Sequence, residues 1–371
     1  MRILLAALDL FGPPGGIARH CRIALKALTE DARVQAVDVV SLLDEPRSAP
    51  DPYYFGKGGR SYVACGGDRR LLVRRVLRAL RRETYDVVLA GHVNLAPLLL
   101  TAAARRGRSK RVTMIYGVDA WVRLPLMRRL ALRRSHRVMA ISGYTARETV
   151  RHNQLDPKKV DLTYACLDPS LARVPSASSA GDGTPAPDRH ALLTVSRLWR
   201  SESSKGHHAI LRALPRVLES VPSAKYWIVG EGDLQPDLER LSDELGVKSH
   251  VRFFGAVSDA SLRNCYQNCA AYVMPSKWEG FGLTFLEAMA YARPIIGGAS
   301  DAAPEILGDA ALLVDPDDTR QIGDAIIRIL SEPDFQARLG AAGQQRLTDH
   351  FTYDKFHSRL MTSLERTLSS N

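Results

Sequence analysis

The sequence has no apolar run long enough to cross a membrane and too few cysteines for a disulfide framework. No stretch approaches the roughly 20 apolar residues that a membrane-spanning helix needs, and residues 1–9 become acidic too soon for a signal peptide. The five cysteines are odd in number and scattered. Cys265 and Cys269 have no second ligand pair nearby, so buried or free thiols are expected rather than a metal site. We therefore expect a cytoplasmic protein without a metal cofactor.

Internal repeats of solenoid period are also absent, and the composition is that of an ordinary globular protein. A chain of 371 residues exceeds what one hydrophobic core usually serves, so two domains are expected. Residues 175–189 are rich in Pro, Ser, Ala and Gly and have no apolar periodicity. They predict a linker between a domain at 1–174 and a domain at 190–350, with residues 351–371 forming a last helix.

The positive charge is concentrated in the first half of the chain. Residues 1–174 contain 31 Lys and Arg against 15 Asp and Glu, a net charge of +16, whereas the remainder has 20 against 25, or −5, which together give +11. Such asymmetry indicates a polyanionic partner for the first half.

The densest basic run is Arg69–Arg82, with a second from Met127 to Arg137. A helix over the first run places its apolar residues on one face, namely Leu72, Val73, Val76, Leu77 and Leu80. The arginines surround the other face. A solvated helix surface explains this pattern, and so does docking on anionic lipid headgroups. Nucleic acid is less favoured, because no recognition motif or interleaved aromatic residue accompanies the charge.

Strand-like and helix-like segments alternate along the chain, which is typical of parallel α/β architecture. Expected strands are 3–8, 37–41, 85–90, 111–115 and 137–140 before the linker, and 191–195, 225–229, 251–254, 271–274 and 294–297 after it. Parallel sheets bind ligands outside the carboxyl ends of their strands. The polar and glycine-rich motifs of the second half all follow expected strands, so they should gather at one edge.

Two glutamates bracket the most informative stretch, Glu279-Gly-Phe-Gly-Leu-Thr-Phe-Leu-Glu287. Gly280 and Gly282 permit a sharp turn, and residues 283–291 have helical periodicity. The first N–H groups of a helix attract anions, because they lack intrahelical partners and lie at the positive end of the dipole. A phosphate bound there would have one carboxylate on each side. A lone carboxylate at Glu287 would be costly in so apolar a helix, which favours a functional role over a solvated surface.

Five segments of the second half, in this order, resemble the retaining family 4 glycosyltransferases of the GT-B fold. They are Ser196-Arg197-Leu198, Lys205-Gly206, Val229-Gly230-Glu231-Gly232, Phe254-Gly255-Ala256-Val257, and the run from Pro275 to Ala290, which matches the E-x7-E signature. The resemblance implies two Rossmann-like domains facing each other across a cleft. The last helix would pack back on the first domain.

The resemblance also implies roles for individual residues. Arg197 and Lys205 would hold the diphosphate of a nucleotide sugar and stabilise the charge that develops as the sugar departs, as a metal does elsewhere. Glu279 would contact the transferred sugar, and Glu287 the ribose. The remaining donor-binding residues would be Gly15, Gly16, Gly230, Phe254, Gly280, Phe281, Gly282, Leu283 and Thr284.

The acceptor side departs from the family pattern. Many relatives carry a histidine where this chain has Tyr116, so His92 or Asp119 becomes the candidate acceptor-side group, each equally compatible with a structural hydrogen bond. Asp315 and Asp317 superficially resemble a metal-binding D-x-D pair but are expected in a surface turn.

The sequence therefore predicts a retaining, metal-independent hexosyltransferase. Its donor would be a UDP-sugar or GDP-mannose, and its acceptor a lipid-linked or membrane-surface glycan. We expect it on the inner face of the membrane, bound through Arg69–Arg82. Two alternatives share the fold: a sugar-nucleotide epimerase, and a catalytically silent scaffold of a glycan-assembly complex.

Overall fold

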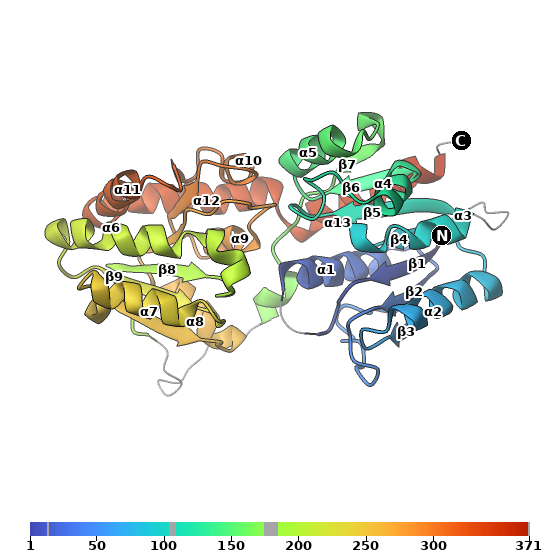
Figure 1. The fold of residues 1–371 in the computed structure, drawn as a ribbon, viewed down its shortest axis with the longest axis horizontal. Coiled ribbons are helices and arrows are strands. Elements are labelled where there is room, and N and C mark those ends of the chain that lie inside the picture. Colours follow the sequence, from blue (N-terminus) through green and yellow to red (C-terminus); the bar gives the residue numbers. More distant parts are fainter. Residues whose placement is uncertain (13–14, 104–108, 174–184, 370–371) are drawn as a thin grey trace. The chain divides into compact units, whose positions relative to one another are not determined.

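The computed structural model describes residues 1–12, 15–103, 109–173 and 185–369. It divides the chain into two compact units, each built on one parallel sheet (Figure 1). Unit 1 comprises Met1–Asp168 and Tyr353–Asn371, and unit 2 comprises Pro169–Thr352. Most of the linker predicted at 175–189 falls outside the described residues.

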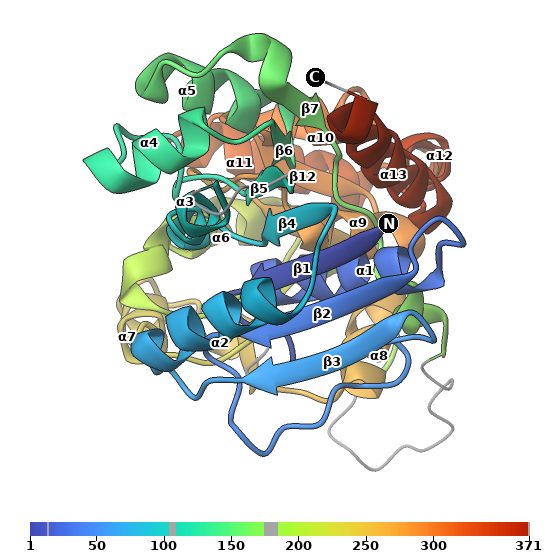
Figure 2. The same ribbon diagram turned by 90° about the vertical axis from the view of Figure 1, so that its right-hand side faces the viewer.

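Unit 1 contains a seven-stranded parallel sheet in the order β3-β2-β1-β4-β5-β6-β7 (Figure 2). Its central strands are almost entirely apolar and buried, as expected for a sheet covered on both faces. The strands are β1 (Arg2–Ala7), β2 (Ala36–Ser41), β3 (Gly59–Ala64), β4 (Val87–Ala90), β5 (Lys110–Ile115), β6 (Arg137–Ala140) and β7 (Val160–Leu162). The chain moves outward from β1 in one direction and from β4 in the other.

The helices of unit 1 bury their apolar faces against this sheet. They are α1 (Gly16–Glu30), α2 (Arg69–Arg82), α3 (Leu98–Ala103), α4 (Leu126–Arg133), α5 (Gly143–Asn153) and α13 (Tyr353–Ser369). Short 3₁₀ turns occur at η1 (Val93–Leu95) and η2 (Pro157–Lys159). The last helix, α13, packs on α1 and β6 with Phe356, Leu360 and Leu364 buried.

Helix α2 has the predicted bounds and begins with an Asp68 cap, whose carboxylate accepts the N–H groups of Arg70 and Leu71. Leu72 and Val76 are buried, as their spacing indicates. Val73 shares this face by its spacing but is 37% exposed, so only part of the apolar face is buried.

Unit 2 contains a six-stranded parallel sheet in the order β10-β9-β8-β11-β12-β13. The strands are β8 (Ala191–Val195), β9 (Lys225–Val229), β10 (Val251–Gly255), β11 (Ala271–Met274), β12 (Ile295–Gly298) and β13 (Leu312–Val314). The helices are α6 (His207–Ser220), α7 (Gln235–Glu244), α8 (Asp259–Asn268), α9 (Leu283–Ala290), α10 (Ala303–Leu307), α11 (Thr319–Ser331) and α12 (Pro333–His350). The 3₁₀ turns are η3 (Pro169–Arg173), η4 (Arg200–Lys205) and η5 (Lys248–His250).

The core of unit 2 lies between β8, β9 and the helices α6 and α11, which contribute Leu192, Ile228, Ile210 and Ile326. Among the described residues, no helix is both long enough and apolar enough to cross a membrane.

Candidate active site

The glutamate-bracketed turn lies where the strand order of unit 2 reverses. β8 and β11 are neighbours in the sheet, but the chain continues from β8 to β9 on one side and from β11 to β12 on the other. Ser196 and Arg197 follow β8, and Pro275–Gly282 follow β11. Ligands of parallel α/β sheets bind at such a point, outside the carboxyl ends of the strands.

Lys205 and Glu279 form an ion pair in this turn, with 2.8 Å between Lys205 Nζ and Glu279 Oε2. Both side chains are largely buried, at 21% and 10% exposure. Gly206 makes the approach possible: it has a φ of +87°, and a Cβ there would lie 2.6 Å from the Pro275 carbonyl oxygen. Burial lowers the pKa of Lys205, but the Glu279 carboxylate outweighs this and raises it, so Lys205 stays charged.

Arg197 contributes a second cation near Lys205. Its Nη2 lies 2.5 Å from Glu202 Oε1, and about half of its side chain is exposed. The Arg197 charge also acts on the pKa of Lys205, which it lowers, while Glu202 raises it. Two cations, Lys205 and Arg197, therefore lie close to one another, and each is paired with a carboxylate.

The turn from Glu279 leads directly into α9. Gly282, with a φ of +85°, is the N-cap residue of α9, and no side chain caps the first N–H groups of the helix. Phe281 anchors the turn, since its ring is buried and contacts Phe351 edge-on at 5.7 Å. The Thr284 hydroxyl accepts a 2.7 Å hydrogen bond from the Tyr272 hydroxyl. The backbone around Gly280 and Leu283 is thus held by the packing of its neighbours.

Glu287 is buried in α9, and the Tyr266 hydroxyl donates to its Oε2 at 2.8 Å. The hydrogen bond explains how an otherwise apolar helix tolerates the charge. Glu287 borders a small cavity whose mouth is open to solvent. The cavity is also lined by Leu171, Asp259, Leu262, Arg263, Tyr266 and Tyr291. The Tyr266 and Tyr291 rings stack at 5.6 Å.

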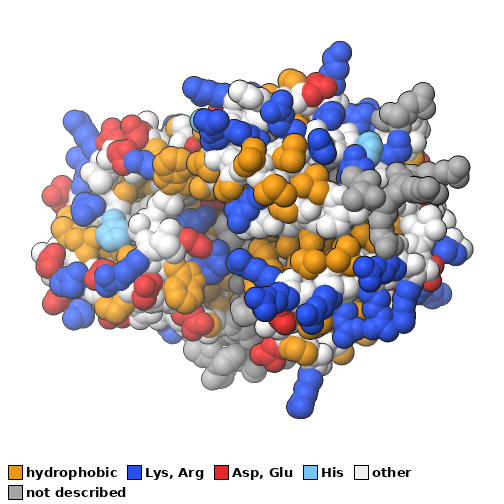
Figure 3. All heavy atoms as spheres, turned by 45° about the vertical axis from the view of Figure 1, so that its right-hand side comes forward, with side chains coloured by type: hydrophobic (Ala, Val, Ile, Leu, Met, Phe, Trp, Pro, Cys, Tyr) orange, Lys and Arg blue, Asp and Glu red, His pale blue; other side chains and the backbone are white. Residues whose placement is uncertain are grey.

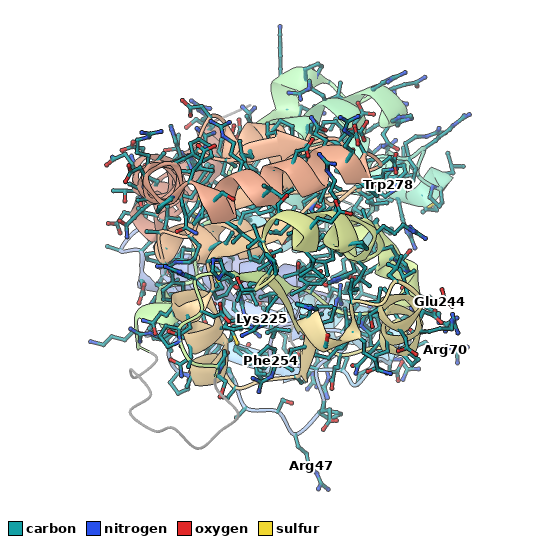
Figure 4. The ribbon with its side chains drawn as sticks, turned by 90° about the vertical axis from the view of Figure 1, so that its left-hand side faces the viewer. Arg47, Arg70, Lys225, Glu244, Phe254 and Trp278 are labelled. Atoms are coloured by element: carbon teal, nitrogen blue, oxygen red, sulfur yellow. The ribbon has the colours of Figure 1, made fainter. Side chains whose placement is uncertain are left out.

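Gly230 and Phe254 have structural roles in unit 2. Gly230 has a φ of +132°, a Cβ there would lie 1.8 Å from the Ser196 carbonyl oxygen, and its N–H donates to the Gly255 carbonyl. It therefore brings together the ends of β8, β9 and β10. The Phe254 ring packs edge-on against Trp227 and beneath the Arg252 guanidinium. Figure 4 shows Phe254 and Trp278, which immediately precedes Glu279, well apart on unit 2.

A buried chain of hydrogen bonds supports the loops that carry Arg197 and Lys205, here called the cation loops. The sequence did not predict this chain. The Ser196 hydroxyl lies 2.8 Å from His207 Nε2, His207 Nδ1 lies 2.8 Å from the Tyr226 hydroxyl, and that hydroxyl donates to Thr194. Thr194 in turn donates to the Val273 carbonyl. Each hydroxyl can donate onward only if Nδ1 of His207 carries the proton. Burial lowers the pKa of His207 to about 3, so the ring stays neutral.

In unit 1, His92 and Asp119 lie together at the carboxyl ends of β4 and β5. His92 Nδ1 accepts the N–H of Asn94 at 3.0 Å, so Nε2 carries the proton. Nε2 lies 3.6 Å from Asp119 Oδ2, and that oxygen is buried without a hydrogen-bond partner in the described part of the chain. Burial and the charge of Arg128 lower the pKa of His92 to about 4. The two groups therefore do not form an ion pair at neutral pH.

Burial also raises the pKa of Asp119 to about 6, although hydrogen bonds from backbone N–H groups of the Tyr116–Asp119 turn oppose the shift. Tyr116 stacks on His92 at 5.9 Å, and its hydroxyl lies 3.2 Å from Cys21 Sγ. Gly15 and Gly16 begin α1 at the end of the loop after β1. Residues 13 and 14 of that loop lie outside the described residues.

The predicted residues thus fall into two groups. Arg197, Lys205, Glu279, Glu287 and the turn between the glutamates belong to unit 2, whereas Gly15, Gly16, His92 and Asp119 belong to unit 1. Within the described residues, no three His, Cys, Asp or Glu side chains gather as a metal site. All five cysteines are buried thiols.

Two protein-family models match the chain, one over each half. The model for glycosyltransferase family 4 matches residues 14–171, and the model for glycosyl transferases group 1 matches residues 183–346.

Individual relatives agree with this assignment. The phosphatidyl-myo-inositol mannosyltransferase of Mycobacterium tuberculosis is 27% identical, with 92% of this chain and 91% of the relative covered. A GDP-mannose-dependent monoacylated α-(1-6)-phosphatidylinositol monomannoside mannosyltransferase of Corynebacterium glutamicum is 26% identical, with 77% and 78% covered.

A solved structure establishes the fold. Anabaena Alr3699/HepE in complex with UDP superimposes with a TM-score of 0.77 over 99% of this chain and all of that one, at 17% identity. Together with the two parallel-sheet α/β units, this superposition shows the GT-B fold. The chain therefore belongs to the family 4 glycosyltransferases and is an enzyme that transfers a glycosyl group from a nucleotide sugar.

Proposed function

We propose that the chain is a retaining, metal-independent mannosyltransferase that uses GDP-mannose and a glycolipid acceptor. The observation that carries this proposal is the buried Lys205–Glu279 pair at the turn into α9. The pair joins a cation suited to a departing diphosphate with a carboxylate suited to the transferred sugar. The named relatives, which act with GDP-mannose on phosphatidylinositol mannosides, favour mannose as that sugar.

The donor diphosphate would bind to Lys205, Arg197 and the first N–H groups of α9. Charge grows on the diphosphate as the glycosidic bond breaks, so these cations and dipoles stabilise the transition state more than the ground state. Lys205 remains protonated because Glu279 raises its pKa. Two fixed cations would supply the charge that a divalent metal supplies in other transferases.

The nucleoside would bind on the Glu287 side of the turn. Glu287 would accept hydrogen bonds from ribose hydroxyls, and its cavity is also lined by Asp259. A carboxylate there favours guanine over uracil, because guanine presents the adjacent donors N1–H and N2–H to one acceptor group. The Tyr291 ring, which stacks on the buried Tyr266, would supply an apolar wall for the nucleoside.

Retention would proceed without an enzyme-bound sugar. Glu279 is held by Lys205 at 2.8 Å, which weakens it as a nucleophile toward the anomeric carbon. The sugar would leave and be attacked on the same face, with the departing phosphate removing the acceptor proton. Glu279 would orient the mannose and stabilise positive charge at its anomeric carbon.

The acceptor would bind to unit 1. The unpartnered Oδ2 of Asp119, beside His92, can accept a hydrogen bond from a sugar hydroxyl. Exposed arginines on α2 would hold the protein on an anionic membrane surface, where a lipid acceptor is found. We place this surface on the inner face of the membrane, where nucleotide sugars are made.

A donor panel tests the proposal. Purified protein is incubated with radiolabelled GDP-mannose or UDP-glucose and an extract of membrane lipids, and label is followed into the lipid phase. We expect transfer from GDP-mannose, its loss in Lys205→Ala, and its retention in Lys277→Ala, a control lysine that follows β11 and pairs with Asp317.

Each alternative gives a different result in this assay. An epimerase would convert the sugar or release nucleotide without an acceptor. A silent scaffold would give no turnover with any donor. Either result would contradict the proposed function.

A further inference from the structure

Exposed apolar side chains are concentrated in one short segment of unit 1. Ten large hydrophobic side chains of the described chain are exposed, and four of them lie between residues 118 and 127. These are Val118, Val122, Leu126 and Met127, which are 46%, 54%, 69% and 55% exposed. Single exposed apolar residues are normal, but four within ten residues form a patch that requires an explanation.

The backbone of this segment is held firmly. Leu124 N–H donates to Asn153 Oδ1 at 2.9 Å, and Asn153 Nδ2 donates to the carbonyls of Ala120 and Val122 at 3.1 Å. The Trp121 ring is buried, and its N–H donates to Thr145. The exposure of Val122 therefore follows from an anchored loop in which its neighbours are buried, and it is not the result of slack packing.

The segment leads into a basic stretch, and Asp119 is its only acid. Between Ala120 and Arg147 the chain has no Asp or Glu. Five arginines follow or interrupt the apolar residues: Arg123, Arg128, Arg129, Arg133 and Arg134. Figure 3 shows hydrophobic side chains bordered by Lys and Arg on the face of unit 1 that is turned toward the viewer.

We propose that this α4 surface, made of the four apolar residues and five arginines above, inserts into an anionic lipid bilayer. Its apolar side chains would enter the boundary between headgroups and acyl chains while the arginines pair with lipid phosphates. The proposal rests on the glycolipid acceptor proposed above. It differs from docking through α2, whose exposed face offers arginines but only Val73 as an apolar residue.

The position of the α4 surface suits a lipid acceptor. Its first residues flank Asp119, and α4 packs against η1, which begins next to His92. A lipid held in the bilayer at α4 would therefore carry its headgroup sugar beside the acceptor-side residues of unit 1. The surface would determine at which depth and orientation the enzyme meets its substrate.

Vesicle binding at two ionic strengths tests the proposal. We compare wild type with Leu126→Ser/Met127→Ser on phosphatidylcholine vesicles with and without phosphatidylglycerol, in low and high salt. High salt screens the arginines but leaves apolar insertion intact. We expect the double variant to lose at least about tenfold in the binding that survives high salt. Trp278→Ser, which removes an exposed side chain of unit 2, should bind like wild type.

Three outcomes overturn the proposal. The double variant binds vesicles as well as wild type does, or wild type shows no binding that resists high salt. In the third, the apolar residues hold two copies of the chain together as a dimer, which the variant no longer forms. Unchanged thermal unfolding of the variant guards against misfolding. Transfer from GDP-mannose to a water-soluble short-chain acceptor should persist in the variant. If wild type itself does not transfer mannose to the soluble acceptor, the proposed function is contradicted instead. Failure of the membrane proposal and failure of the proposed function are therefore distinguishable.

Discussion

Lys205 and Glu279 are separated by 74 residues along the chain yet form one buried ion pair. At the scale of single residues, this pair links the loop after β8 to the turn after β11. Neither group is free of the other, so a change to one alters the charge that the other presents to a ligand.

We predict that Lys205→Ala weakens GDP binding about 10- to 100-fold, the effect of losing a charge-assisted hydrogen bond of about 1.5–3 kcal/mol. Isothermal titration calorimetry measures the affinity. Lys277→Ala removes an exposed lysine that follows β11 and pairs with Asp317, and it serves as the matched control. Equal affinity of Lys205→Ala and wild type would remove Lys205 from the diphosphate site.

Asp119 predicts a pH dependence. Its pKa is raised to about 6, so the carboxylate is protonated below and ionised above that pH. If ionised Asp119 accepts a hydrogen bond from the hydroxyl of the sugar acceptor, kcat/KM should rise with pH through about 6. Asp119→Asn should not show this rise. A pH–rate profile that is the same for both proteins would contradict the assignment.

The same shift has a consequence for stability. Because the folded pKa lies above the unfolded value, Asp119 stabilises the fold at low pH and this contribution is lost as the pH rises from about 4 to 6. At pH 7.5, Asp119→Asn should therefore have a free energy of unfolding about 1–3 kcal/mol higher than wild type, and it should unfold at a higher temperature. Thermal unfolding of both proteins at pH 4.5 and 7.5 checks the sign.

At the scale of elements, Gly282 determines how the turn enters α9. It has a φ of +85°, and a Cβ there would lie 2.3 Å from the Phe285 ring. We predict that Gly282→Ala destabilises unit 2 by about 1–3 kcal/mol and weakens GDP binding, because both the strain and the clash displace the turn. Gly246→Ala is a control at a similar φ, with open space around its Cβ. Comparable denaturation midpoints for the two variants would contradict this account.

The His207 chain couples β8, β9 and α6 beneath the cation loops. We predict that His207→Ala lowers the free energy of unfolding by about 1–3 kcal/mol, since it leaves the Ser196 hydroxyl without its acceptor and leaves Tyr226 with Thr194 alone. If these hydrogen bonds also position Arg197, the variant should lose more in kcat than in GDP affinity. Ser196→Ala should show the same pattern. A loss of stability with unchanged kinetics would limit His207 to a structural role.

Much of this architecture could be predicted from the sequence. The central strands, such as β8 and β11, were predicted with correct bounds, because buried parallel strands are short apolar runs between turns. β3 and β7 were missed. They are half-exposed edge strands with weak apolar patterns, and β7 has only three residues.

The candidate site was predictable only in part. The turn from Glu279 to Glu287 is contiguous, so its glycines and acids could be interpreted from their spacing. The partners of these residues are distant in sequence: Tyr266 donates to Glu287, and His207 supports Ser196, without any periodic signal. Contacts of this kind depend on strand order, which local sequence does not encode.

At the scale of the whole molecule, the excess positive charge lies in the half that contains α2. We predict that Arg74→Ala/Arg78→Ala/Arg81→Ala weakens binding to anionic vesicles about 100-fold in low salt, at about 1 kcal/mol per arginine. The difference should shrink in high salt, because these side chains are exposed and screened.

The matched control removes three exposed arginines of unit 2, as Arg216→Ala/Arg240→Ala/Arg328→Ala. Both triple variants lose the same formal charge. Equal loss of vesicle binding in the two would indicate a general charge effect and not a surface on α2.

The most direct test of the central claim is mannosyl transfer in the presence of a chelator. Radiolabelled GDP-mannose, membrane lipids and EDTA are incubated with the enzyme, and the lipid product is analysed by NMR for its anomeric configuration. We predict a mannolipid with the α configuration of the donor, formed at the rate seen without EDTA and absent with Lys205→Ala. Loss of transfer on chelation, or a β-linked product, would contradict the account.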